Sequence, residues 1–225
     1  MSTWPPFPPE PWKPRHNPWQ PEPRPGTTPA AGPSLVLVEA RPDRLAERMI
    51  EQRLVAVAGE LDSEAANRAV ATLALLDASG DEPVELRLSG VSADLDTALT
   101  LVDTLDLMGV PVHATCLGAL TGPAVALVAV ADQRVAGPHA VLHLCEPRPP
   151  RGIAGRDLDT YAQHYQRQLR RLQERIATAC RRPVDVVAGD MRDGRLLTAE
   201  QARAYGLVDT CTARSTRRPG APASG

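Results

Sequence analysis

The residues from Cys116 to Ala124 have the pattern of a turn that presents a nucleophile, but they lack the nucleophile. A strand predicted at 111–115 leads into a turn containing glycine and then into an apolar helix predicted at 124–131. Such a turn lifts one side chain to the amino end of a helix, where a hydroxyl or thiol can attack a carbonyl carbon. The expected place is taken by Gly122, which has no side chain, and Pro123 follows without a backbone N–H for a developing oxyanion.

Two nearby residues could supply a substitute nucleophile. Thr121 carries a hydroxyl one residue earlier, and a shift of one residue would restore a backbone N–H from Gly122, but no base accompanies it. Cys145 and His143 are two residues apart after an apolar strand, so they share one face of the extended chain. Core packing is the commoner fate of such a cysteine. We expect neither residue to restore the chemistry.

Length and composition limit the class of the protein. Its 225 residues, 43% hydrophobic and 23% charged, can bury one core. A net charge of -2 gives no reason to expect nucleic-acid binding, and no apolar run approaches the roughly 18 residues of a membrane span. The start lacks a signal-peptide pattern, and four scattered cysteines lack metal-binding spacing. We expect a cytoplasmic protein with reduced thiols, no cofactor and no membrane contact.

The two ends differ in composition from the middle. Residues 1–33 contain all three tryptophans, the only phenylalanine and about half of the 23 prolines. Proline at this density excludes regular helix and sheet, so we expect a disordered leader, whose aromatic residues could alternatively dock in a partner's groove. Residues 212–225 are expected to form a flexible tail. One folded domain is therefore expected at 34–211.

Between the ends, short apolar strands alternate with helical stretches, which predicts an α/β fold. Strands are predicted at 54–58, 84–88, 111–115 and 207–209, with a hairpin from 133–136 to 140–144. Helices are predicted at 63–77, 94–108, 124–131, 157–179, 183–191 and 198–205. The first of these helices is expected to be capped by Asp62 or Ser63, and the last by Thr198.

The middle of the chain, roughly 45–210, resembles the proteolytic subunit of the Clp protease, within the Clp and crotonase-like fold. The cues lie in the same order and spacing as in that family, and the last one is the most specific. They are Glu47–Val57, Ala65–Arg68, Val102–Leu105, Pro111–Gly118, Pro138–Pro147 and Leu197–Asp209. The resemblance implies repeated βα units and a protruding handle helix, which is the long helix at 157–179.

Family members use a serine, a histidine and an aspartate, and here that triad is degenerate. The resemblance places the serine position at Gly122, the histidine position at Cys145 and the aspartate position at Asp190. Only Asp190 is retained, and Arg192 and Arg195 nearby could neutralise it. A zinc site of His143, Cys145 and Asp190 would have suitable ligand types. Because nothing but the resemblance brings these three together, we expect no metal.

The oxyanion positions are also altered. The glycine-rich loop of the family aligns with Gly90–Ala93, where Ala93 replaces a glycine, and the second donor position is Pro123. In subtilisin, loss of the serine or histidine of such a triad costs on the order of a million-fold in turnover. Loss of one oxyanion donor costs about 10²- to 10³-fold. The resemblance thus predicts a chain without useful peptidase activity of its own.

Three functions are open. The first is a noncatalytic subunit that co-assembles with an active paralogue in stacked rings fed by a Clp-type hexameric ATPase, with the leader near the axial gate. The second is an active peptidase of serine, cysteine or threonine type with a relocated nucleophile. The third is a crotonase-like enzyme acting on acyl thioesters, which the loop at 90–93 and Pro123 disfavour. We expect the first.

Overall fold

The structure is a computed structural model that describes residues 42–147 and 158–212. The predicted leader at 1–33 lies outside the described residues, as does the predicted tail except for its first residue. Within the described chain, no helix is long and apolar enough to cross a lipid bilayer.

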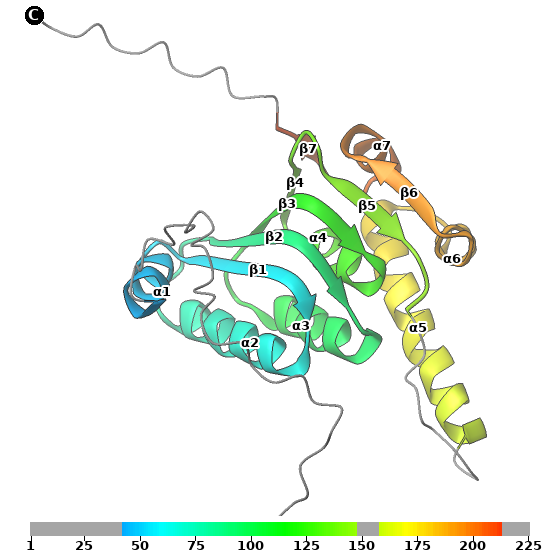
Figure 1. Ribbon diagram of the computed structural model, residues 1–225, viewed down its shortest axis with the longest axis horizontal. Helices are drawn as coiled ribbons and strands as arrows, with labels where there is room; N and C mark the ends of the chain where they lie inside the picture. The colour runs from blue at the N-terminus through cyan, green and yellow to red at the C-terminus, as the bar shows by residue number, and fades with distance from the viewer. Residues whose placement is uncertain (1–41, 148–157, 213–225) are drawn as a thin grey trace, which may run out of the picture. The chain divides into compact units, whose positions relative to one another are not determined.

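A parallel sheet forms the centre of the fold. Its strands lie in the order β1 (Leu54–Leu61), β2 (Val84–Ala93), β3 (Val112–Thr121), β4 (Gln133–Ala136) and β7 (Thr210–Cys211). Between the first three strands run α2 (Ser63–Ala78) and α3 (Leu95–Leu107), which lie side by side below the strands in the view of Figure 1. The predicted α/β fold with repeated βα units is therefore confirmed.

The predicted hairpin is wrong. β4 pairs in parallel with the first half of β3, at His113–Cys116, and β5 (Val141–Leu144) pairs in parallel with its end, at Ala119–Thr121. β4 and β5 therefore do not pair with each other. β5 instead pairs with the antiparallel strand β6 (Arg195–Thr198), which was not predicted. The lengths and spacing of the two strands suggested a hairpin, but both β4 and β5 pair with β3, which lies earlier in the chain.

Strands β1, β2 and β3 are longer than predicted because each bends at a glycine instead of ending. Gly59, Gly90 and Gly118 have φ of 76°, 60° and 68°, which residues with a side chain rarely adopt. The strand registers shift at the first two and then resume, as in β-bulges. The turn predicted after residue 115 is therefore part of strand β3, which curves towards β5 (Figure 1).

The helices follow the predicted segments closely. Asp62 caps α2 and Asp94 caps α3, each by accepting a backbone N–H. The predicted helix at 124–131 is a 3-10 turn at Gly122–Ala124 followed by the short α4 (Val125–Ala129). The handle helix is α5 (Leu158–Cys180), followed by α6 (Val184–Asp193) and α7 (Ala199–Tyr205). Thr198 caps α7, as predicted, and Gln201 completes a capping box that was not predicted. Helix α1 (Pro42–Glu51) was not predicted either.

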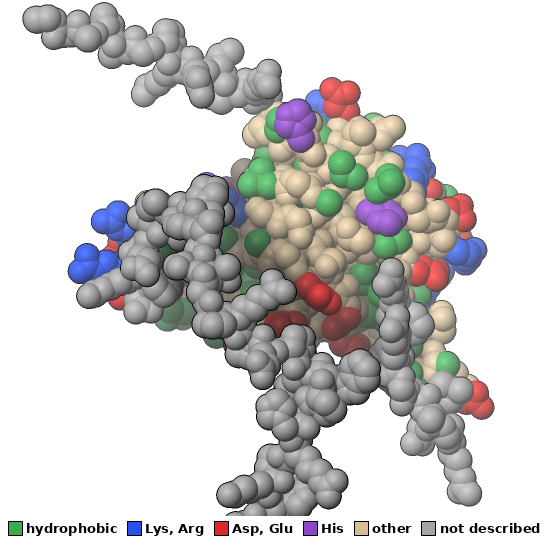
Figure 2. All heavy atoms as spheres, in the orientation of Figure 1, with side chains coloured by type: hydrophobic (Ala, Val, Ile, Leu, Met, Phe, Trp, Pro, Cys, Tyr) green, Lys and Arg blue, Asp and Glu red, His purple; other side chains and the backbone are tan. Residues whose placement is uncertain are grey.

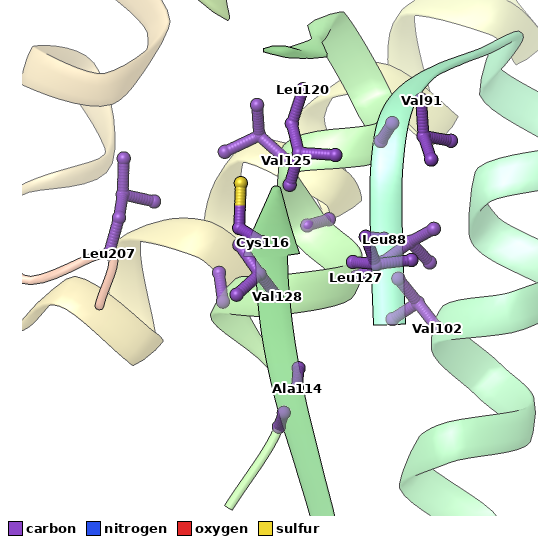
Figure 3. Packing of buried hydrophobic residues seen from close by; sticks show 14 of the residues in the cluster. Leu88, Val91, Val102, Ala114, Cys116, Leu120, Val125, Leu127, Val128 and Leu207 are labelled. Atoms are coloured by element: carbon purple, nitrogen blue, oxygen red, sulfur yellow. The ribbon is translucent and has the colours of Figure 1, made fainter. Parts of the chain in front are cut away.

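The core lies between the sheet and these helices. Alternate side chains of the strands point at α3 and at α4, whose five residues are all buried. Figure 3 shows Leu88, Ala114 and Cys116 of the strands meeting Val102, Leu127 and Val128 of the helices. Burial raises the pKa of the Cys116 thiol to about 12, so this cysteine is a core residue without nucleophilic character.

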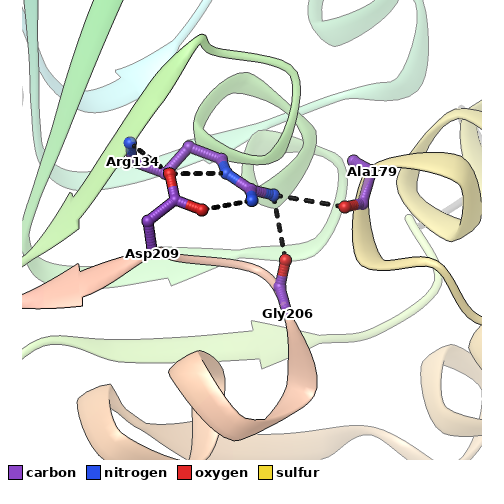
Figure 4. Close-up of polar contacts among 4 residues, drawn as sticks. All are labelled: Arg134, Ala179, Gly206 and Asp209. Carbon is purple, nitrogen blue, oxygen red and sulfur yellow. Dashed lines mark hydrogen bonds and ion pairs between the residues drawn. The ribbon is translucent and has the colours of Figure 1, made fainter.

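An ion pair between Arg134 and Asp209, which we call the fork, holds the segment before β7 against the sheet. The Arg134 guanidinium on β4 forms a two-pronged ion pair with Asp209 and also donates to the carbonyl oxygens of Gly206 and Ala179, as Figure 4 shows. These contacts hold the pKa of the Asp209 carboxyl below its usual range. The last strand follows the fork at Thr210–Cys211, three residues later than predicted.

Candidate functional site

The structure brings Gly122 and Cys145 together. Gly122 is buried at the end of β3, with φ of 61°. A side chain there would place its Cβ atom 3.5 Å from Cys145 Sγ and 3.4 Å from the Cys145 carbonyl oxygen. The contact exists because β5 pairs with the last three residues of β3, so the residues just after both strands meet. A hydroxyl on one residue and an imidazole on the other would be in reach, but neither group is present.

The two predicted oxyanion positions lie beside this contact. Pro123 is buried in the 3-10 turn that follows Gly122, and it offers no N–H. Ala93 is half-buried at the end of β2, and the residue before it, Ser92, is in register with Thr121. A tetrahedral intermediate at Gly122 would therefore lack the N–H that the residue after a nucleophile commonly donates.

Thr121 has a neighbour that the sequence did not predict. It pairs in register with His143 of β5, and side chains at such positions share a face of the sheet. Both residues are half-buried. No hydrogen bond joins either side chain to any residue in 42–147 or 158–212. The threonine hydroxyl thus has an imidazole nearby that does not hold it in an activated position.

Asp190 is engaged by residues other than Cys145. One carboxylate oxygen accepts a hydrogen bond of 2.7 Å from the Tyr205 hydroxyl, and the other forms a 2.9 Å ion pair with Arg195. The expectation that a nearby arginine neutralises Asp190 is therefore confirmed for Arg195. Asp190 lies on α6, Arg195 on β6 and Tyr205 on α7, so the carboxylate joins three elements.

Tyr205 is the centre of this cluster. Its ring is buried and lies under two guanidinium groups, with Arg182 at 4.1 Å and Arg195 at 5.5 Å from the ring centroid. Burial and the hydrogen bond to Asp190 both raise the pKa of the Tyr205 hydroxyl, which therefore stays protonated as a donor. The sequence alone indicates no role for Tyr205, because its partner Asp190 lies fifteen residues earlier in the chain.

Other reactive groups are dispersed. Burial also raises the pKa of the Cys180 thiol, to about 11. The Cys211 thiol donates to the Ala199 carbonyl oxygen at 3.2 Å. Within the described residues, no three histidine, cysteine or acidic side chains gather closely enough to hold a metal ion.

These features define an α/β protein of the Clp and crotonase-like fold, with a parallel βα sheet, a second strand pair and a long handle helix. A model of the Clp protease family matches residues 38–215. The chain therefore belongs to the Clp protease family, as its resemblance indicated.

Curated relatives agree with this assignment. The chain is 29% identical to ATP-dependent Clp protease proteolytic subunit 3 of Rhodococcus jostii, over 74% of this chain and 84% of that protein. It is 28% identical to the subunit of the same name in Streptomyces coelicolor, over 86% and 90%. A third relative, a Clp protease proteolytic subunit-like protein of Streptomyces coelicolor, is 32% identical over 72% and 79%.

Proposed function

We propose that this chain is a noncatalytic subunit of an ATP-dependent Clp protease. The observation that carries the proposal is the contact between Gly122 and Cys145, which we take as the serine and histidine positions of the family. A glycine has no atom to attack a carbonyl, and a thiol does not replace the imidazole as a base at neutral pH. Each loss alone would lower turnover on the order of a million-fold by analogy with subtilisin.

The surroundings of these two positions support the same proposal. Pro123 removes an oxyanion donor, and Asp190 is held by Tyr205 and Arg195. Asp190, which we take as the third triad position, thus belongs to a cluster with Tyr205 and Arg195 that joins α6, β6 and α7. These contacts give Asp190 a structural role that does not require catalysis.

Partners follow from the family. Two relatives are named as proteolytic subunits of an ATP-dependent Clp protease. We propose that this chain occupies positions in stacked rings together with an active paralogue, and that a Clp-type hexameric ATPase feeds these rings in the cytoplasm. An inactive subunit is compatible with such an assembly, because the active members still cleave substrate.

Co-expression with the other Clp proteolytic subunits of the same organism tests the proposal. We expect native mass spectrometry to find mixed rings, and the purified chain alone to leave short fluorogenic peptides uncleaved. Peptide cleavage by the chain alone, abolished by Thr121→Ala or Cys145→Ala, would refute the noncatalytic assignment. Absence of this chain from every ring would refute the partner assignment.

A second candidate is a threonine-type peptidase, which one observation favours: Thr121 and His143 are register neighbours. The imidazole could remove the hydroxyl proton as the oxygen attacks, if it moved into hydrogen-bonding distance. Labelling by a fluorophosphonate probe that maps to Thr121 and disappears in His143→Gln would establish this function. Failure to label Thr121 would exclude it.

A further inference from the structure

The parallel sheet has one face that no helix of the described chain buries. The register partners Val57, Leu88 and Cys116 are buried on the face that packs against the helices. Ala56 and Arg87, which are register partners on the opposite face, are exposed. Parallel sheets occur almost only with both faces covered. This opposite face, which we call the open face, therefore lacks the second layer that such a sheet normally has.

The middle of the open face combines a positive charge with an apolar side chain. A row of register partners crosses the face from β1 to β7, through Ala56, Arg87, Thr115, Val135 and Thr210. Arg87 forms no hydrogen bond or ion pair with another described residue. Beside it, Leu117 of β3 is 41% exposed. A covering partner should therefore offer an anionic group and an apolar group at matching places.

Helix α3 carries a row of residues with these properties, which we call the α3 stripe. It consists of Asp96, Thr100, Asp103 and Leu107, which are all exposed and spaced by four, three and four residues, so they line one side of the helix. Leu107 is 84% exposed, more than any other large hydrophobic side chain of the described residues. Neither Asp96 nor Asp103 forms an ion pair with a described residue. In Figure 2, acidic side chains gather near the ends of β1 and β2, where α3 begins.

We propose that the α3 stripe of a second copy of this chain docks on the open face, with its Asp103 against Arg87 and its Leu107 over Leu117. The carboxylate supplies the charge that Arg87 lacks within its own chain, and the two leucines remove each other from water. The inference rests on the proposed function, since it names the surfaces through which copies of the noncatalytic subunit meet in a ring.

The spacing of the two contacts agrees on both surfaces. Leu107 lies four residues after Asp103, which is about 6 Å along a helix. Leu117 is in register with Ser89, so it lies one strand across and two residues along from Arg87, at about 8 Å. The long arginine side chain can take up the difference of about 2 Å. One helix can therefore make both contacts at once.

The contact joins two different surfaces, so every copy offers one of each. Such a heterologous contact continues from copy to copy, and it produces a ring when the rotation between copies closes. A contact between identical surfaces would instead stop at two copies. Association through the open face should therefore proceed beyond dimers.

Sedimentation of the purified full chain, without any paralogue, tests the proposal. We expect the wild type to associate beyond dimers, and Arg87→Asp and Asp103→Arg each to weaken association at least about tenfold, because like charges then meet. The variant Arg87→Asp/Asp103→Arg restores opposite charges and should return to within about threefold of the wild type. Arg203→Asp is the matched control, because Arg203 is exposed on α7 outside both surfaces, and it should associate like the wild type.

Cross-linking provides a second readout. In Leu107→Cys/Leu117→Cys, a mild chemical oxidant should join neighbouring copies into a ladder of dimers, trimers and larger species on nonreducing gels. Each single variant should give no such ladder. A monomeric wild type, no recovery in the double charge variant, or an equal ladder in a single cysteine variant would each overturn the proposal. Mixed rings with a paralogue in any of these cases would leave the proposed function standing, so the two failures are distinguishable.

Discussion

At the scale of single residues, the proposed noncatalytic role depends on two positions, Gly122 just after β3 and Cys145 just after β5. Gly122 and Cys145 are in contact, and the proposal takes them as the serine and histidine positions, which function only together. On the same proposal, Pro123 lacks the backbone N–H that would stabilise the oxyanion of the transition state. Restoring only one of these groups should therefore raise peptidase activity little.

We predict that Gly122→Ser/Cys145→His/Pro123→Ala cleaves fluorogenic peptides at least about 10²-fold faster than Gly122→Ser/Cys145→His, because the last change restores an N–H donor. Gly122→Ser alone should remain at the wild-type background and lose stability, since φ of 61° is strained for serine. The triple variant with alanine at position 122 is the control. If that alanine variant were as active as the serine variant, another residue would be the nucleophile.

The retained carboxylate leads to a stability prediction. Tyr205→Phe removes the hydrogen bond to Asp190 but keeps the buried ring and its arginine contacts. We expect a loss of about 1–3 kcal/mol in the free energy of unfolding, since the acceptor is ionised. Tyr161→Phe is the matched control, because the Tyr161 hydroxyl donates to no residue of the described chain. Equal unfolding midpoints in urea for the two variants would contradict a structural role of Asp190.

At the scale of elements, close approach of backbones explains which glycines are needed. A Cβ atom on Gly206 after α7 would lie 2.9 Å from the carbonyl oxygen of Cys180, at the end of α5. Gly59 in β1 has a similarly positive φ, but a Cβ there would meet open space. The first glycine is thus required by packing and by conformation, and the second by conformation alone.

We predict that Gly206→Ala costs more than about 3 kcal/mol in the free energy of unfolding, because α7 must move away from α5. Gly59→Ala should cost about 1 kcal/mol, the conformational term alone. Thermal unfolding of both variants compares them directly. A loss in Gly206→Ala no larger than in Gly59→Ala would show that α7 can shift at little cost.

The fork between Arg134 and Asp209 makes the attachment of β7 dependent on pH. The pKa of Asp209 is lower in the folded protein than in the unfolded chain, so the ionised carboxylate adds stability above the unfolded value of about 4, and protonation removes it as pH falls. Asp209→Asn should lower the free energy of unfolding by about 1 kcal/mol at pH 7, a value reduced for partial exposure.

The difference between Asp209→Asn and the wild type should shrink as pH falls below about 4. Denaturant titrations at pH 7 and pH 3 measure it. Asp185→Asn serves as the control, because its ion pair with Arg170 is far more exposed and should contribute little. A difference for Asp209→Asn that stayed constant over this range would show that the fork does not depend on charge.

At the scale of the whole molecule, the sequence predicted features formed by neighbouring residues better than contacts between distant segments. The caps of α2 (Asp62 or Ser63) and of α7 (Thr198) were predicted from short spacings, and Asp62 and Thr198 are the caps observed. Such predictions succeed because a cap contacts only its own first turn. The residue ranges of α2, α3 and α5 followed from apolar periodicity in the same way. Such features involve residues a few positions apart.

Features that depend on distant partners were missed. β4 and β5 were read as a hairpin, but β3 offers two successive pairing segments, and each strand took one. β6 was not predicted, since its short run became a strand only beside β5. The Tyr205 cluster was missed for the same reason, because its two arginines and its carboxylate come from other elements.

The alternation of strands and helices between residues 54 and 131, the family, and the glycine at position 122 are properties of the sequence itself, because periodicity and motif spacing are local along the chain. That Gly122 meets Cys145, and that Asp190 faces Tyr205 and Arg195, was decided only by the tertiary structure. The physical reason is that strand pairing and helix packing select one set of distant neighbours from many, and no single segment contains that choice.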